Sequence, residues 1–240
     1  MKIAFVIQRY GSEVLGGAEQ LCRLVAERLA PTHDVDVLTT CARDYVTWKN
    51  EYPEGADRVK GVTVRRFASA RTRDIESFNT YSNWIFNNPH THADEMEWLK
   101  QQGPWCPALT DFLRRNHQQY DVLIFFTYLY APTVLGVRIA PHKTILVPTA
   151  HDEPAIHLGI YREMFAKPSA VAFNTEVEKN FLKTTFEFHA AAEETVGCGV
   201  DLLQDAAQAD EPEPEDDDEI HKRLPQHLRE IGRASCRERV

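Results

Sequence analysis

The chain has 240 residues, of which 43% are hydrophobic, and its formal net charge is −9. This composition allows a sizeable core, and the negative charge argues against non-specific nucleic-acid binding. No apolar run is long enough to span a bilayer, and the first residues lack the pattern of a secretory signal. Five cysteines without metal-ligand spacing are typical of reduced thiols, which predicts a cytoplasmic protein.

The chain opens with a predicted strand, a glycine-bearing loop and a helix. Lys2–Gln8 is nearly continuous apolar sequence, as in a parallel strand that is buried on both faces. Arg9–Gly17 interrupts it with three glycines, and apolar residues recur at helical spacing from Ala18. Free N–H groups at a helix N-terminus suit an anion, so Gly16 and Gly17 mark either a phosphate-binding loop or only a tight turn. The spacing is neither GxGxxG nor that of a Walker loop.

The next stretch predicts two more strands and then a group of helices. Asp34–Thr40 and Val62–Phe67 have strand patterns, and Asn50–Gly61 is predicted as the polar connection between them. The first helix and the strands on either side of it therefore form a βαβ unit. Ala68–His117 lacks strand patterning and predicts two or three helices. Trp98 in this stretch belongs either to the core, which is usual for aromatic residues at helical spacing, or to the wall of a binding cleft.

The second half of the chain continues the alternation of strands and helices. Buried strands are predicted at Asp121–Thr127, Lys143–Pro148, Ala170–Phe173 and Glu194–Cys198. A short helix is predicted at Thr133–Ala140. The alternation predicts an α/β fold of Rossmann-like type, with a doubly wound parallel sheet covered by helices on both faces.

Two helix starts in this half have capping signals. Pro154 fits the first turn of a helix, with Glu153 or Asp152 as its cap. Thr175 and Glu178 have the spacing of a capping box at the start of another helix.

The C-terminal stretch differs in composition from the rest. Asp210–Glu219 contains only acidic residues and two prolines, which predicts a solvated linker. Ile231–Val240 can be back-translated into a common sequencing-library adapter, so we expect these residues to be an artefact and the natural chain to continue. The predicted organisation is a domain at 1–201, a linker at 202–230 and the artefact at 231–240.

Candidate site residues follow from the predicted topology. In a doubly wound sheet, ligands bind beyond the carboxyl ends of the strands. The polar residues expected at such ends are Gly16, Gly17, Tyr128, Tyr130, His151 and Asp152. His151 beside Asp152 either moves protons near neutral pH, or satisfies a backbone carbonyl while Asp152 caps a helix. There is no GxSxG elbow, and the histidine spacings predict no metal site.

Four of these segments resemble motifs of family 4 glycosyltransferases, which are retaining enzymes with two facing Rossmann-like domains (the GT-B fold). The first thirty residues, with Gly16-Gly17-Ala18-Glu19, resemble the start of that family. PTAHDEP around His151 is similar to its strand-end histidine motif, and FNTEVEKNFL at Phe173–Leu182 to a later strand–helix junction. VGCGVD at Val196–Asp201 looks like the end of the family's first domain.

The resemblance implies a role for each candidate residue. The chain is then the acceptor-side half of an enzyme that moves a sugar from a nucleotide-diphosphate sugar to a glycan, a lipid-linked sugar or a small acceptor. Gly16 and Gly17 approach the donor diphosphate through their backbone, and His151, with Asp152 beside it, faces the transferred sugar. Acceptor contacts are assigned to three tyrosines, Tyr10, Tyr128 and Tyr130. Members of the family generally need no metal, so no cofactor is expected.

The sequence departs from the family in one large respect. The family's second domain, with its E-x7-E motif, has no counterpart in these residues, so we expect the 240-residue chain alone not to transfer sugar. The alternative is a non-catalytic Rossmann-like binding module whose acidic tail contacts a basic partner. A nicotinamide-dependent oxidoreductase is disfavoured by the missing GxGxxG. Peripheral membrane contact occurs in this family, but no basic amphipathic stretch supports it here.

Overall fold

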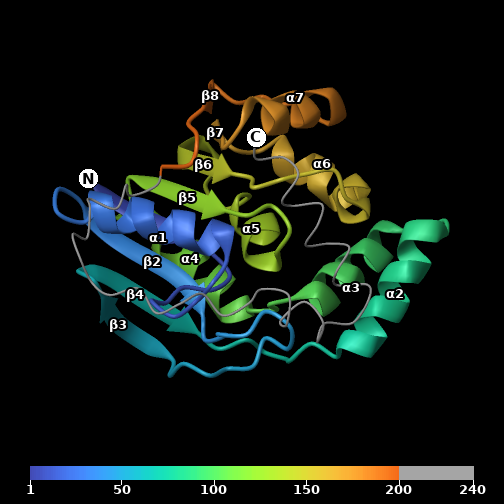
Figure 1. The fold of residues 1–240 in the computed structure, drawn as a ribbon, viewed down its shortest axis with the longest axis horizontal. Helices are drawn as coiled ribbons and strands as arrows, with labels where there is room; N and C mark the ends of the chain where they lie inside the picture. The colour runs from blue at the N-terminus through green and yellow to red at the C-terminus, as the bar shows by residue number, and fades with distance from the viewer. Residues whose placement is uncertain (200–240) are drawn as a thin grey trace, which may run out of the picture. The chain divides into compact units, whose positions relative to one another are not determined.

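The computed structural model describes residues 1–199, which form a single sheet with helices packed against it (Figure 1). The strand order is β3-β4-β2-β1-β5-β6-β7-β8. The strands are β1 Lys2–Val6, β2 Asp34–Thr40, β3 Gly55–Val59, β4 Val62–Phe67, β5 Val122–Phe126, β6 Thr144–Val147, β7 Ala170–Phe173 and β8 Ala192–Thr195. The predicted linker, the predicted artefact and the end of the predicted first domain at 200–201 lie outside the described residues.

The sheet is parallel except at one edge, which confirms the predicted α/β, Rossmann-like fold class. β1 pairs in parallel with β2 on one side and β5 on the other, with Phe5 opposite Val37 and Ile124. Successive residues of β1 point to opposite faces, so Ala4 and Val6 join one core cluster while Ile3 and Phe5 join the other. A central strand that is buried on both faces needs the apolar run that the sequence has here.

The strand β3 was not predicted, because its residues were assigned to a polar connection. It pairs antiparallel with β4, and its side chains are mostly exposed, so no apolar alternation marks it. Lys60 and Gly61 join the two strands with φ angles of 46° and 87°. Two consecutive residues with positive φ form the type of turn that matches the twist of a hairpin.

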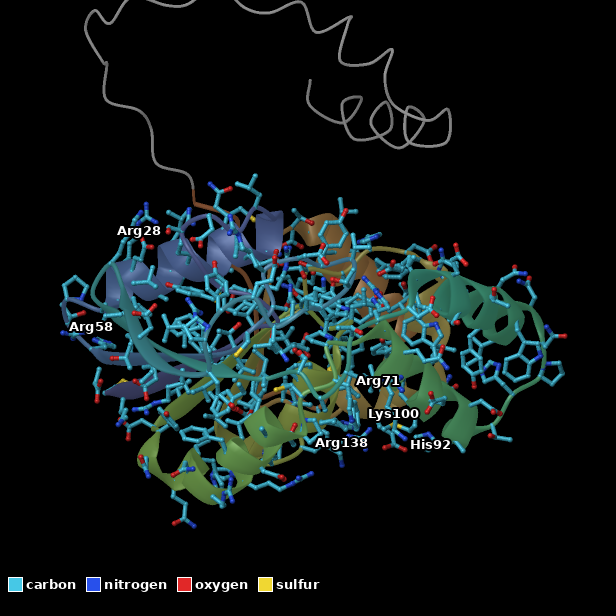
Figure 2. The ribbon with its side chains drawn as sticks, turned by 90° about the horizontal axis from the view of Figure 1, so that it is seen from below. Arg28, Arg58, Arg71, His92, Lys100 and Arg138 are labelled. Carbon is cyan, nitrogen blue, oxygen red and sulfur yellow. The ribbon has the colours of Figure 1, made fainter. Side chains whose placement is uncertain are left out.

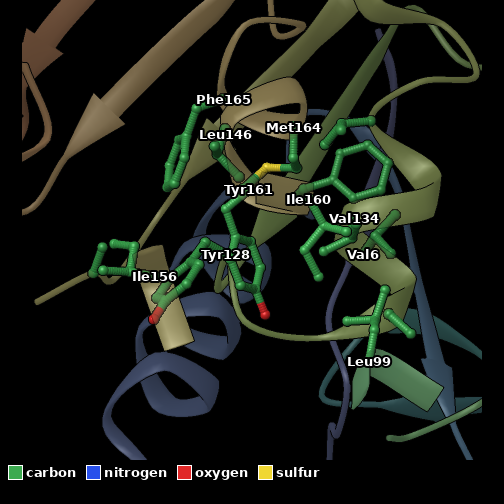
Figure 3. Packing of buried hydrophobic residues seen from close by; sticks show 14 of the residues in the cluster. Val6, Leu99, Tyr128, Val134, Leu146, Ile156, Ile160, Tyr161, Met164 and Phe165 are labelled. Atoms are coloured by element: carbon green, nitrogen blue, oxygen red, sulfur yellow. The ribbon is translucent and has the colours of Figure 1, made fainter. Parts of the chain in front are cut away.

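Helices cover both faces of the sheet, as a doubly wound fold requires. They are α1 Gly17–Leu29, α2 Ile75–Asn87, α3 His92–Gln102, α4 Pro107–Asn116, α5 Ala131–Gly136, α6 Gly159–Phe165 and α7 Glu176–Thr185, with short 3-10 turns at His117–Gln119, Pro141–Lys143 and Pro154–His157. The helix α1 packs on one face through Cys22 and Ala26. The larger cluster lies on the other face, where residues of α5 and α6 such as Val134 and Tyr161 pack together (Figure 3). Among the described residues, no helix is long and apolar enough to cross a membrane.

Three helices, α2 to α4, fill the excursion between β4 and β5, in agreement with the prediction of two or three. Trp98 on α3 is only 2% exposed and donates a hydrogen bond from Nε1 to Ser82 Oγ at 2.9 Å. The core interpretation is therefore correct for this tryptophan. Basic side chains are dispersed over the surface, with Arg28 and Arg58 toward one end and Arg71, Lys100 and His92 toward the other (Figure 2).

Several predicted boundaries were wrong by two residues or more. The helix expected at Thr133–Ala140 begins at Ala131, because Pro132 fits the first turn of a helix. The last strand lies at Ala192–Thr195 and not at Glu194–Cys198, because pairing with β7 fixes its register. Pro154 starts only a 3-10 turn, and that turn has no side-chain cap.

Candidate functional site

The carboxyl ends of the parallel strands place four connecting loops at one edge of the sheet. They are the loops that follow β1, β5, β6 and β7. These four strands are consecutive in the sheet. Parallel strands end at the same edge, so the fold alone brings these loops together. The predicted site residues are distributed over them.

The two glycines before α1 have different surroundings. Arg9 and Glu19 form a buried ion pair beneath the loop, with Glu19 Oε1 2.6 Å from Arg9 Nη2 and 3.0 Å from Arg9 Nε. A Cβ atom on Gly16 would collide with the Glu19 carboxylate, whereas a Cβ on Gly17 would meet no atom within 4 Å. Gly16 therefore makes room for the ion pair, while Gly17 borders open space at the N-terminus of α1. No pattern in the sequence predicted the Arg9–Glu19 pair.

A chain of polar contacts joins the loop after β5 to the loop after β6. The buried Tyr128 donates its hydroxyl hydrogen to Glu153 Oε1, and the second oxygen of Glu153 lies 3.7 Å from His151 Nε2. Burial raises the pKa of Tyr128 far above its usual range, and the negative charge of Glu153 raises it further. The tyrosine is therefore a neutral donor, and Glu153 connects it to His151, which is itself 73% exposed.

The structure contradicts one of the two alternatives for His151 and Asp152, the one in which Asp152 caps a helix. The side chain of His151 lies next to the Glu153 carboxylate, and Asp152 pairs with His157, with Oδ1 2.9 Å from Nε2. Neither Glu153 nor Asp152 caps the turn that Pro154 begins. Glu153 is therefore a candidate site residue, although the sequence analysis considered it only as a possible helix cap. Its position two residues after His151 is the sequence feature that could have identified it.

Glu178 fixes the loops that follow β6 and β7. Its carboxylate accepts hydrogen bonds from the backbone N–H groups of Ala150 and Asn174, both at 2.6 Å. The predicted capping contact is present on one side, where Thr175 Oγ1 accepts from the Glu178 N–H at 3.0 Å. Burial raises the pKa of Glu178, although these backbone hydrogen bonds and the nearby His151 oppose that rise.

Two threonines at this edge have a left-handed backbone. Thr127 follows β5 with φ of 68°, and Thr149 lies two residues after β6 with φ of 51°. Positive φ is a genuine outlier for a β-branched residue, and such strain persists only where the surroundings impose it. Such outliers cluster at functional sites in proteins, and here they lie in the loops that follow two neighbouring strands. The sequence shows a threonine after each strand, but its pattern does not reveal φ.

Buried oxygen atoms at the same edge have no hydrogen-bond partner within the described chain. They are Gln8 Oε1 after β1, Thr127 Oγ1 after β5 and Asn174 Oδ1 after β7. Buried polar atoms are nearly always satisfied, so each exception calls for an explanation. Their positions after three different strands are consistent with a polar ligand at this edge.

The two remaining tyrosines are placed differently. Tyr130 packs edge-on against Trp48, with ring centroids 5.3 Å apart, and burial raises its pKa to about 12. Glu19 raises that pKa further while Arg73 opposes it, so the Tyr130 hydroxyl lies close to the charges at the edge. Tyr10 follows β1 and is buried in the core cluster that also contains Cys22 and Ala26 of α1. Within residues 1–199, no group of three or more His, Cys, Asp or Glu side chains is placed to hold a metal ion.

Comparisons with known proteins found structures that are similar to this fold. No protein-family model matches the sequence, and no curated protein matches it either. Sucrose-phosphate synthase from Thermosynechococcus elongatus has a similar structure, with a TM-score of 0.51 and 13% identity over 83% of this chain. The chain spans 48% of that synthase chain, and 90% of a shorter version of the same protein. A trehalose 6-phosphate synthase from Burkholderia multivorans matches at 11% identity, over 75% of this chain and 40% of that one, with a TM-score of only 0.45.

These findings define the fold class of the chain. The chain has the Rossmann-like α/β fold that also occurs in GT-B glycosyltransferases. At this level of identity the likeness concerns the fold, so the activity has to be argued from the site.

Proposed function

We propose that the chain supplies the acceptor-side Rossmann-like domain of a retaining glycosyltransferase of the family 4 type. The enzyme moves a sugar from a nucleotide-diphosphate sugar to a glycan, a lipid-linked sugar or a small glycoside. The observation that carries the proposal is the placement of Gly17, Tyr130 and His151 in or next to the loops at one edge of the sheet, where Thr127 and Thr149 have positive φ.

The donor diphosphate binds at the N-terminus of α1. The first N–H groups of a helix and its dipole favour negative charge. Gly17 borders open space there, so a phosphate can approach the backbone without meeting a side chain. Glu19 does not oppose this binding strongly, because its charge is matched by Arg9 at 2.6 Å.

His151 orients the transferred sugar. Glu153 lies 3.7 Å from its Nε2 and is held in turn by the hydroxyl of Tyr128, so the imidazole has a defined neighbour although it is exposed. Asp152 restrains the same loop through His157. No side chain acts as a nucleophile: the acceptor oxygen attacks the anomeric carbon, the bond from that carbon to the diphosphate breaks, and the acceptor proton passes to a phosphate oxygen. No metal is required for this step.

The remaining donor contacts come from a second Rossmann-like domain. The described residues span about half the length of the sucrose-phosphate synthase chain that they resemble. We therefore expect the 240-residue chain alone to bind ligands weakly and not to transfer sugar.

The proposal is tested by assaying two proteins in parallel. One is the 240-residue chain, and the other is the product of the gene resequenced from source DNA across the codons for Leu228–Val240. Both are incubated with uridine, guanosine and adenosine diphosphate sugars, and nucleotide release and glycoside formation are measured. Transfer by the longer product with retained anomeric configuration supports the proposal. Inverted configuration, or no transfer from any donor by either protein, overturns it.

A further inference from the structure

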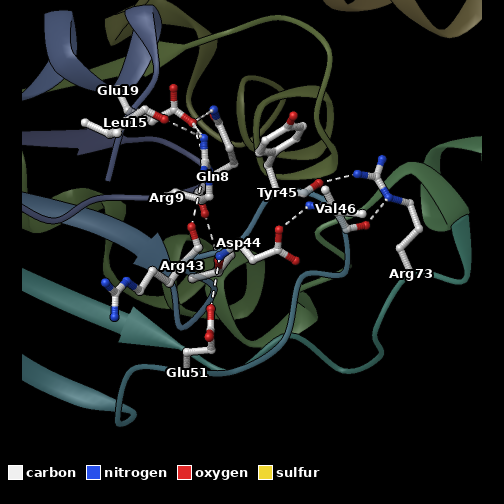
Figure 4. A network of polar contacts seen from close by, with 11 residues as sticks. Gln8, Arg9, Leu15, Glu19, Arg43, Asp44, Tyr45, Val46, Glu51 and Arg73 are labelled. Carbon is white, nitrogen blue, oxygen red and sulfur yellow. Dashed lines mark hydrogen bonds and ion pairs between the residues drawn. The ribbon is translucent and has the colours of Figure 1, made fainter. Parts of the chain in front are cut away.

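We propose that Tyr45 is a stacking platform for an uncharged sugar ring of the acceptor, an inference that rests on the proposed function and narrows its substrate class. The residue lies in the loop after β2, next to the loop that carries Arg9 (Figure 4). Neither the sequence patterns nor the predicted site included it.

The Tyr45 ring packs against the guanidinium group of Arg9, which is held by several hydrogen bonds. The guanidinium carbon of Arg9 lies 5.2 Å from the centroid of the Tyr45 ring. That guanidinium donates to Glu19, to the Arg43 carbonyl at 3.0 Å and to the Leu15 carbonyl at 3.3 Å. All three nitrogen atoms of the guanidinium are therefore engaged, and its position is fixed by the loops after β1 and β2 together.

The backbone on both sides of Tyr45 is also held. Arg73 donates from Nη2 to the Tyr45 carbonyl and from Nε to the Val46 carbonyl at 2.8 Å. The Asp44 carboxylate accepts from the N–H groups of Val46 at 2.9 Å and Thr47 at 2.6 Å. Figure 4 shows Arg73 joined to the backbone of Tyr45 and Val46, and Asp44 joined to Val46.

Despite this restraint, Tyr45 is 57% exposed. Val46, the next residue, is also exposed, as is Leu15, whose carbonyl accepts a hydrogen bond from Arg9. A tyrosine that is fixed and exposed offers a large contact area at a low cost in conformational entropy. Tyr130 and Arg73 both pack against the ring of Trp48, in the same loop as Tyr45, so polar groups border this region. An apolar face bordered by hydrogen-bonding groups matches a pyranose, which has C–H bonds on its faces and hydroxyl groups around its rim.

The charges favour a neutral ring over a sugar phosphate. The cation under Tyr45 is neutralised, because Arg9 and Glu19 form an ion pair in which each side chain is 8% exposed. Arg73 directs its donors to the carbonyls of Tyr45, Val46 and Gln102, and its burial lowers its pKa. These cations have little capacity left for a phosphate group.

The test measures carbohydrate binding to the 240-residue chain directly. Methyl α-glucoside, methyl α-mannoside, methyl β-galactoside and glucose 6-phosphate are titrated and followed by saturation-transfer difference NMR. We expect at least one neutral glycoside to bind with a Kd of about 1–50 mM. Tyr45→Ala should weaken it about fivefold to tenfold, the scale of one lost aromatic contact. Tyr45→Phe should stay within about twofold, because the ring is kept.

Trp84→Ala is the matched control, because Trp84 is an exposed aromatic residue on α2 and is 39% exposed. It should bind the glycosides as the wild type does, and circular dichroism should show that all variants are folded. Equal binding by wild type and Tyr45→Ala, tighter binding of glucose 6-phosphate, or no binding of any neutral glycoside would overturn the inference. If the 240-residue chain binds a glycoside through Tyr45 but neither this chain nor the longer product transfers sugar, the proposed function fails and the sugar-binding role of Tyr45 stands. Transfer by the longer product that is unaffected by Tyr45→Ala would do the reverse.

Discussion

The carboxylate of Glu178 on α7 reaches across to the loop after β6 and accepts a hydrogen bond from the backbone N–H of Ala150 at 2.6 Å. Its other oxygen accepts from Asn174 at the same distance. One buried acid therefore ties together the loops that follow β6 and β7. His151 is the residue after Ala150, so the position of the proposed sugar-binding histidine depends on this contact.

Replacing Glu178 should destabilise the fold. Glu178→Ala leaves two buried N–H groups without their acceptor, and we expect a loss of about 2–4 kcal/mol in the free energy of unfolding. Urea denaturation followed by circular dichroism measures it. Glu176→Ala is the matched control, because Glu176 lies in the same first turn and is exposed; it should change stability by less than about 0.5 kcal/mol. Equal effects of the two substitutions would show that the Glu178 contacts contribute little.

The same residue predicts a pH dependence. Burial raises the pKa of Glu178 above its ordinary value of 4.5, so between these two pKa values the folded chain binds more protons than the unfolded chain. This contribution to stability is fully present below pH 4.5 and is lost as the pH rises through the raised pKa. Glu178→Gln removes the titrating group, so its unfolding free energy should fall less than that of the wild type from pH 4.5 to 7. Parallel profiles for the two proteins would contradict the raised pKa.

Because the backbone at Thr149 is strained, glycine should stabilise the fold more than alanine at this position, which is the reverse of their usual order. Glycine adopts positive φ without a steric cost, whereas alanine keeps the strain at φ of 51°. Thr149→Gly should therefore be more stable than Thr149→Ala by about 1 kcal/mol, as measured by chemical denaturation. At Thr133, which is inside α5, the same pair of substitutions should rank in the opposite order by a similar amount. If alanine were the better residue at both positions, Thr149 would not be strained in solution.

The two glycines before α1 should respond differently to a side chain. Gly16→Ala forces a Cβ into the Glu19 carboxylate and disturbs the Arg9–Glu19 pair, so we expect a loss of about 2–4 kcal/mol in stability. Gly17→Val meets open space, so its stability should change by less than about 1 kcal/mol. In the enzyme that transfers sugar, Gly17→Val should nevertheless raise the KM for the donor, because its side chain occupies the path of the diphosphate. Unchanged donor kinetics would refute the placement of the diphosphate at α1.

His151→Ala should separate function from stability. The side chain is 73% exposed, so its removal should change the free energy of unfolding by less than about 0.5 kcal/mol. If His151 orients the reacting sugar, kcat for transfer should fall by about a hundredfold or more in the enzyme assayed above. His142→Ala removes an exposed histidine in the turn before β6, at the opposite end of that strand, and serves as the control, with kcat expected within about threefold of the wild type. Equal kcat values for the two variants would exclude the role given to His151.

Most strands of the sheet could be predicted from local sequence patterns. Asp34–Thr40, Val62–Phe67 and Ala170–Phe173 form strands with the predicted bounds, because alternating or continuous β-branched residues allow few other structures. The parallel alternation with helices then fixes the edge at which ligands bind. The edge strand β3 escaped prediction, because a strand with exposed side chains needs no apolar pattern.

Only the tertiary structure decided which groups meet at that edge. Arg9 with Glu19, Tyr128 with Glu153 and Glu178 with Ala150 are separated by 10, 25 and 28 residues along the chain. Each contact joins different elements, and a local pattern encodes the geometry of one element at a time. The positive φ of Thr127 and Thr149 arises in the same way, because strain at one residue is maintained by the packing of the chain around it.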